Sequence, residues 1–103
     1  MRKRIVITGI GILASNGIGK DAFFSALRDG VSGMKPVTLF DTTTVNTKLA
    51  CEISNFDPKA ILGKKGLRNL DRTTLLAMSA SQLALEDAGL EIPISEEITD
   101  LVG

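Results

Sequence analysis

Residues 4–11 read Arg-Ile-Val-Ile-Thr-Gly-Ile-Gly, a β-branched apolar run between a basic start and two closely spaced glycines. A continuous β-branched run is typical of a strand buried on both faces, as in a parallel or mixed sheet covered by helices. We therefore expect a strand at Ile5–Ile7. The final residues, 98–103, also read as the beginning of an apolar strand. The chain is thus expected to be the front part of a larger protein.

Two further segments have the spacing of helices. Apolar side chains recur at helical intervals across residues 21–29, and Gly30 follows as a left-handed cap. Asp71 is placed to cap a second helix, which Gly89 ends. We expect one side of this helix to carry Leu76, Ala80, Leu83 and Ala84. Its many small residues predict close approach by another helix or a sheet.

A long irregular connection, residues 31–70, joins the two helices. Pro36, Pro58 and several glycines interrupt it, and short pieces such as Lys48–Ile53 look extended. The predicted fold class is α/β, with one clear strand, two helices and a long irregular connection. We expect residues 1–103 to form a single, incomplete domain.

Composition excludes several classes of function. The chain has twelve basic and twelve acidic residues and zero net charge, so electrostatic capture of nucleic acid is not expected. No apolar run approaches the roughly 20 residues that span a bilayer, and Thr8 and Gly9 interrupt the segment that resembles a signal peptide. A single cysteine fits a reducing compartment. These observations predict a cytoplasmic protein without a membrane partner.

The chain has no histidine, no tyrosine and no tryptophan, and its one cysteine is Cys51. Histidine is the side chain that supplies a base near neutral pH without strong tuning, so complete catalysis by these residues is not expected. Cys51 lies in an extended segment beside Glu52 rather than beside a cation or a helix N-terminus, which favours a structural thiol. One cysteine and no histidine also make a metal site improbable. We expect no cofactor.

A glycine-rich segment suggests an alternative function. Thr8-Gly9, followed by Gly17-Ile18-Gly19, is similar to the phosphate-binding turn of short-chain dehydrogenases. Val37–Phe40 with Asp41 would then be the second strand and its ribose-binding acid. However, seven residues separate Gly9 from Gly17, where that family has three, and the chain has no tyrosine for the usual proton donor. A dinucleotide-binding oxidoreductase fragment therefore remains the second hypothesis, and a non-catalytic interaction module the third.

A basic cluster, Lys64, Lys65 and Arg68, precedes the second predicted helix. If the segment is helical, these three side chains share one exposed face and form a small cationic patch. An ordinary solvated surface is the alternative interpretation. The cluster alone does not identify a partner.

Six short motifs occur in a characteristic order along the chain. They are RIVITGIG at 4–11, SG at 32–33, FDT at 40–42, NFDP at 55–58, RNLDR at 68–72 and ALEDAGL at 84–90. The ordered set covers essentially the whole chain and resembles the start of a β-ketoacyl-acyl-carrier-protein synthase of the type II, thiolase-fold family. The resemblance implies that the chain is the amino-terminal part of a thiolase-like fold.

The resemblance also implies an activity, a decarboxylating Claisen condensation in fatty acid or related polyketide synthesis. A cysteine carries the acyl group while two histidines help malonyl-carrier protein to lose carbon dioxide and attack. In the family these three residues come later, so none maps onto residues 1–103, and this chain alone is expected to be inactive. Cys51 falls at a position that is commonly glycine there.

The resemblance assigns one site within this chain. Lys64, Lys65 and Arg68 match basic positions that in family members meet the acidic acyl carrier protein. Asn69 departs from a position that is often basic. The resemblance further implies a homodimer in the full-length form.

Overall fold

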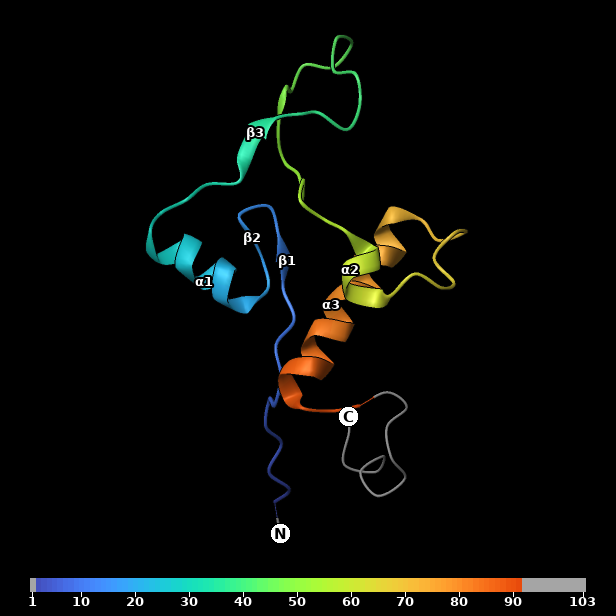
Figure 1. Ribbon diagram of the computed structural model, residues 1–103. Coiled ribbons are helices and arrows are strands. Elements are labelled where there is room, and N and C mark those ends of the chain that lie inside the picture. The colour runs from blue at the N-terminus through green and yellow to red at the C-terminus, as the bar shows by residue number, and fades with distance from the viewer. Residues whose placement is uncertain (1, 92–103) are drawn as a thin grey trace.

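The computed structural model describes residues 2–91, which form an elongated body of 57 × 36 × 23 Å. Within these residues the elements follow in the order β1 (Leu13–Ala14), β2 (Gly17–Ile18), α1 (Lys20–Arg28), β3 (Met34–Pro36), β4 (Leu49–Cys51), α2 (Pro58–Leu62) and α3 (Arg72–Ala88). Figure 1 shows α3 at the centre of the body, with the N-terminal segment running past its lower end, α1 on one side and the β3–β4 arm projecting above.

The strand expected at Ile5–Ile7 is not formed. The segment is extended but has no hydrogen-bonded neighbour among the described residues, and Ile5 is 93% exposed and Ile7 is 87% exposed. A strand requires a partner to satisfy its amide and carbonyl groups, and none of the described elements supplies one. The apolar run therefore lies at the surface. The strand expected at residues 98–103 lies outside the described residues.

Residues 13–18 instead form a small antiparallel hairpin that sequence analysis did not anticipate. Leu13 pairs with Ile18, and Ala14 pairs with Gly17 across a two-residue turn. The backbone then enters α1 through Gly19, whose φ of 89° lies in the region that favours glycine. The first predicted helix is confirmed: α1 covers nearly the expected residues, starting one residue earlier, and the left-handed Gly30 follows it as predicted.

The β3–β4 arm is an antiparallel hairpin within the predicted irregular connection. Its register pairs Met34 with Cys51 and Pro36 with Leu49, so the extended piece expected near Lys48–Ile53 is confirmed. Beyond the ladder, the Glu52 carboxylate accepts hydrogen bonds from the Thr38 amide at 2.7 Å and the Thr38 hydroxyl at 3.0 Å. The amide hydrogen bond is the main reason why the pKa of Glu52 lies below its usual value.

The second predicted helix is confirmed, and a third, short helix was not predicted. The Asp71 side chain accepts a hydrogen bond from the Thr74 amide at 2.8 Å and caps α3, which ends at the left-handed Gly89. The short α2 begins at Pro58 behind the capping residue Asp57 and packs against α3. Proline is favoured at the first turn of a helix, where its missing amide is not needed.

Very little of the described chain is buried. Ala26 and Ser79 are 7% and 0% exposed, and Gly33 is also buried, whereas many large apolar side chains remain exposed. None of the described helices has the length and apolar character needed to cross a membrane. The described residues thus form a scaffold of small sheets and helices with large uncovered apolar faces.

Candidate functional site

The predicted basic cluster lies in the connection between α2 and α3, at the right of Figure 1. Lys64 and Lys65 occupy a bend and Arg68 occupies a turn, and all three side chains are exposed. The segment is therefore not helical, which corrects the condition under which the cluster was expected to share one helix face. Gly63 and Gly66, with φ of 83° and 79°, account for this because they adopt left-handed conformations that interrupt a helix.

α2 and the loop that follows it carry only positive charges. Residues 58–70 contain four cations, Lys59, Lys64, Lys65 and Arg68, and no acidic residue. No carboxylate within the described range forms an ion pair with any of them. The loop therefore presents unneutralised positive charge to solvent, although the chain as a whole is neutral.

Two capping carboxylates delimit the loop. Asp57 Oδ1 accepts a hydrogen bond from the Lys59 amide at 3.1 Å, at the start of α2. At the other end, hydrogen bonds from the Thr74 hydroxyl and amide hold the pKa of Asp71 below its usual value. Both carboxylates accept hydrogen bonds at the start of their own helices, and neither forms an ion pair with the described cations between them.

Arg72 connects the start of α3 to the segment that precedes α2. Its Nη2 donates a hydrogen bond to the Ile53 carbonyl oxygen at 2.6 Å, and its guanidinium carbon lies 5.7 Å from the centre of the Phe56 ring. Sequence analysis missed this contact, because Ile53 and Arg72 are 19 positions apart and the segment between them gives no periodic signal.

The glycines of the N-terminal segment have a packing role. A Cβ on Gly9 would collide with the Ala84 carbonyl oxygen and lie 2.8 Å from the Ala88 Cβ, and a Cβ on Gly11 would collide with the Ala80 carbonyl oxygen. The segment therefore lies directly against the small residues of α3. The small residues thus permit close approach, but the neighbour is the irregular N-terminal segment and not the helix or sheet that was expected.

This packing argues against a dinucleotide site. Gly9 and Gly11 face α3 and leave no space for a pyrophosphate, while a Cβ on Gly17 would lie 2.7 Å from the Phe23 amide nitrogen. Asp41 accepts hydrogen bonds from the Thr43 amide at 3.0 Å and the Thr43 hydroxyl at 2.8 Å, within an exposed loop. These hydrogen bonds lower the pKa of Asp41. Val37–Phe40, expected as the second strand, follows β3 and is not part of a strand. The structure therefore gives no support to the nucleotide hypothesis.

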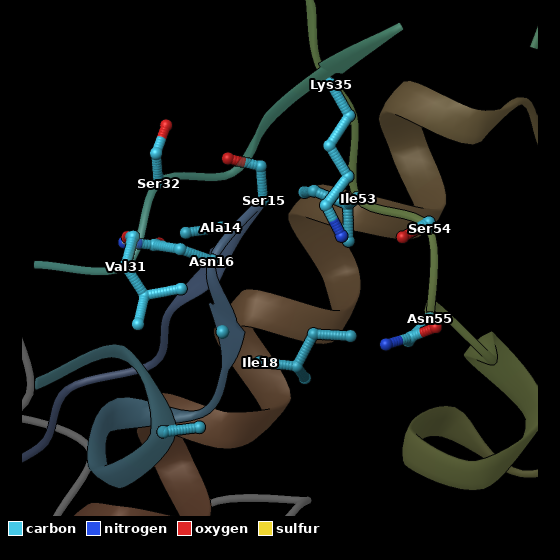
Figure 2. A pocket seen from close by; sticks show the side chains of 12 residues that line it. Ala14, Ser15, Asn16, Ile18, Val31, Ser32, Lys35, Ile53, Ser54 and Asn55 are labelled. Atoms are coloured by element: carbon cyan, nitrogen blue, oxygen red, sulfur yellow. The ribbon is translucent and has the colours of Figure 1, made fainter. Parts of the chain in front are cut away.

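An open groove of about 510 Å³ lies between the β1–β2 hairpin, the start of β3 and residues 53–55. Figure 2 shows the Lys35 side chain descending from β3 between Ser15 of the hairpin and the Ser54–Asn55 segment. A Cβ on Gly33 would collide with the Ser15 side chain, so the hairpin and β3 are in close contact here. The groove brings together polar groups but no two groups suited to acid–base catalysis.

Asp87 joins three parts of the chain that are distant in sequence. Its Oδ2 accepts a hydrogen bond from the Ile10 amide at 2.9 Å, and its Oδ1 forms an ion pair with Lys20. The hydrogen bond with Lys20, followed by that from Ile10, lowers the pKa of Asp87, and the same contact raises the pKa of Lys20. The contact holds α1 and the N-terminal segment against the end of α3. Sequence analysis did not identify it.

Cys51 is exposed at the end of β4, opposite Met34 of β3. It lies in a strand and not at a helix N-terminus. No group of three or more potential ligands in residues 2–91 could hold a metal ion. The described geometry therefore contains a cationic surface loop but no assembled catalytic centre.

Comparison with known proteins identifies the larger group. Residues 2–100 match the family described as beta-ketoacyl synthase, N-terminal domain. The chain is 40% identical over 91 residues to 3-oxoacyl-[acyl-carrier-protein] synthase 2 of Coxiella burnetii, a match covering 88% of this chain and 22% of that protein. It is 36% identical over 96 residues to the actinorhodin polyketide putative beta-ketoacyl synthase 2 of Streptomyces coelicolor, covering 93% of this chain and 23% of that protein.

A solved structure supports the same assignment. The ishigamide ketosynthase/chain length factor superimposes with a TM-score of 0.82 and 36% sequence identity, covering 88% of this chain and 23% of that chain. The fold is therefore that of the opening part of a ketosynthase. The chain belongs to the beta-ketoacyl synthase family and spans about a fifth to a quarter of the length of the relatives described here. The oxidoreductase alternative has no support among these comparisons.

Proposed function

We propose that this chain is the amino-terminal part of a β-ketoacyl-acyl-carrier-protein synthase, which condenses an acyl chain with malonyl-carrier protein and releases carbon dioxide. The observation that carries the proposal is the match of residues 2–100 to the N-terminal domain of the family. The names of the similar curated proteins support an acyl carrier protein as the source of substrate.

The proposal divides the work between this chain and the rest of the synthase. Residues 1–103 contain no histidine, and their one cysteine, Cys51, is an exposed residue of a surface hairpin. The acyl-carrying cysteine and the two histidines that assist decarboxylation would therefore come from outside these residues. The part played by this chain is to build the scaffold and to receive the carrier protein.

The exposed apolar faces support the scaffold role. Ile5, Val6 and Ile7 border a groove of about 480 Å³ whose other wall is formed by Ala84, Leu85 and Ala88 of α3. In a complete synthase, strands and helices from the remaining sequence would cover such faces, because uncovered apolar surface on this scale is unfavourable in water. We propose that the complete enzyme acts as a homodimer in the cytoplasm.

Lys64, Lys65 and Arg68 are proposed to dock the carrier protein. The support is that all three are exposed and that residues 58–70 contain no acidic residue. An acidic partner is attracted to such a loop over about 10 Å at 0.1 M salt, which raises the association rate and orients the encounter. The three cations lie on an exposed connection between two helices, a position that suits contact with a protein surface rather than with the reacting acyl group.

The condensing activity is tested with the complete synthase that contains this chain. Incubation with a carrier protein that bears an acyl chain and with carboxyl-labelled malonyl-carrier protein should release labelled carbon dioxide and form the extended β-ketoacyl product in equal amounts. The 103-residue chain by itself should give the same signal as a blank without enzyme, because it lacks the nucleophile and the base. Failure of the complete protein to form product would contradict the proposed activity.

A further inference from the structure

The loop that carries the basic residues has few contacts of its own. Within residues 64–70 there is one backbone hydrogen bond, from the Leu70 amide to the Leu67 carbonyl oxygen at 3.3 Å. A side chain added at Gly63 or Gly66 would meet open space, so nothing packs against these positions. The places of Lys64, Lys65 and Arg68 are therefore set by the two helices at the ends of the loop.

One of these helices cannot hold its own position. α2 contains five residues, far fewer than the roughly 12–15 that make an isolated helix even marginally stable. Its position is set by its packing against α3 and by the preceding segment, residues 53–57. Whatever fixes the incoming chain thus also fixes the first end of the basic loop.

Arg72 makes that connection from the other end of the loop. It is the first residue of α3, and it donates to the Ile53 carbonyl oxygen at 2.6 Å while its guanidinium group lies 5.7 Å from the centre of the Phe56 ring. Both contacts fall on the segment that enters α2. Arginine suits this position because its planar group donates hydrogen bonds in one direction and lies against an aromatic ring in another.

We propose that Arg72 is a positioning residue for carrier docking: by tying the entry of α2 to the start of α3, it closes the base of the loop and fixes the arrangement of Lys64, Lys65 and Arg68. This inference rests on the docking function proposed above. Arg72 acts through the loop, so its loss should impair recognition of the carrier and leave the chemistry unchanged.

The test compares Arg72→Met and Arg72→Lys in the complete synthase. Each variant should raise the KM for the acylated carrier protein by about threefold to tenfold, the net effect of one typical hydrogen bond, with kcat unchanged. Acylation by a small acyl thioester that bypasses the carrier should proceed at the wild-type rate. Arg72→Lys preserves the positive charge, so a raised KM in this variant cannot be attributed to lost charge. Arg28→Lys, the same exchange on exposed α1, is the matched control and should leave KM unchanged.

Hydrogen exchange gives a second readout, because the hydrogen-bonded amides of Ala60, Gly63 and Leu70 should exchange faster in both Arg72 variants. A wild-type KM in Arg72→Lys would overturn the inference, since Arg72 would then act through charge alone. A parallel loss of acylation by the small thioester and of thermal stability would also overturn it, because the role would be general stability. The double reversal Lys64→Glu with Arg68→Glu separates the two proposals. If it leaves KM unchanged, docking itself is wrong; if it raises KM while the Arg72 variants do not, the positioning role alone is wrong.

Discussion

The contact between Gly11 and α3 leads to a prediction for a single added methyl group. In Gly11→Ala, the new Cβ would collide with the Ala80 carbonyl oxygen and lie 2.6 Å from the Ala84 amide nitrogen. Both are backbone atoms in the middle of α3, so no rotamer change relieves the overlap. Forced overpacking of this kind costs about 1–3 kcal/mol and at times more, and rigid backbone neighbours place this case at the upper end.

An opposing effect is smaller. Alanine restricts the unfolded chain more than glycine does, which stabilises a folded protein by about 0.4–1 kcal/mol where the native backbone accepts it. The net expectation is a loss of about 2 kcal/mol or more in the free energy of unfolding. Gly9→Ala should lower the free energy of unfolding in the same way. Adding Ala88→Gly to it should restore stability only in part, because the new Cβ would still collide with the Ala84 carbonyl oxygen.

The assay is thermal and denaturant unfolding of the complete synthase, with hydrogen exchange of the α3 amides as the local readout. Ser25→Ala, at an exposed position of α1, is the control and should unfold like the wild type. If Gly11→Ala unfolds at the wild-type midpoint and its α3 amides exchange at wild-type rates, then the N-terminal segment does not pack against α3 as described.

Three further outcomes are expected. Asp87→Asn and Lys20→Met should each loosen α1 from α3, and the double variant should lose less than the sum of the two, because both remove the same ion pair. The folded-state pKa of Asp87 is lowered and that of Lys20 is raised, so the ion pair should contribute fully to stability between about pH 4 and about pH 10. Its contribution should fade as the pH falls toward the folded pKa of Asp87 or rises through that of Lys20. A pH series of unfolding midpoints checks this, and a difference between wild type and Asp87→Asn that does not change with pH would contradict it. The 103-residue chain by itself should self-associate or aggregate through Ile5–Ile7 and the arm, so a monodisperse monomer in sedimentation would contradict the scaffold role. Cys51→Ser in the complete synthase should retain wild-type acylation by a small thioester, whereas loss of acylation would make Cys51 the nucleophile after all.

Local signals in the sequence were sufficient for the two longer helices. α1 and α3 were predictable because capping residues such as Asp71 and Gly89, and the helical spacing of apolar side chains, are local features of the sequence. The prediction of a strand at Ile5–Ile7 was wrong for the described residues. An apolar β-branched run favours extended backbone, but a strand also needs a hydrogen-bonded partner, and the described residues offer none. The short α2 was missed because five residues carry too little periodicity.

The proposed docking residues Lys64, Lys65 and Arg68 rest on the family resemblance, and their geometry could not be predicted from the sequence. Two left-handed glycines, Gly63 and Gly66, keep the segment from being a helix, which was the condition for the three side chains to share one helix face. The roles of the N-terminal glycines were also beyond sequence reasoning. A glycine that accepts a phosphate and a glycine that admits a helix look identical in one sequence, and only the position of α3 distinguishes them.

The central claim, that this chain supplies the carrier-docking surface of a synthase, is tested most directly by titrating acyl carrier protein into the complete enzyme at two salt concentrations. The variant is Lys64→Glu with Arg68→Glu, and the matched control is Arg2→Glu with Lys3→Glu, the same change of charge at exposed residues beside the N-terminus, which lies at the bottom of Figure 1 and away from the α2–α3 connection at the right. At about 0.05 M salt the variant should bind roughly tenfold more weakly than wild type, mainly through a slower association rate, and the difference should shrink at about 0.3 M salt as the charges are screened. The control should bind like wild type. Equal binding of variant, control and wild type at low salt would contradict the claim.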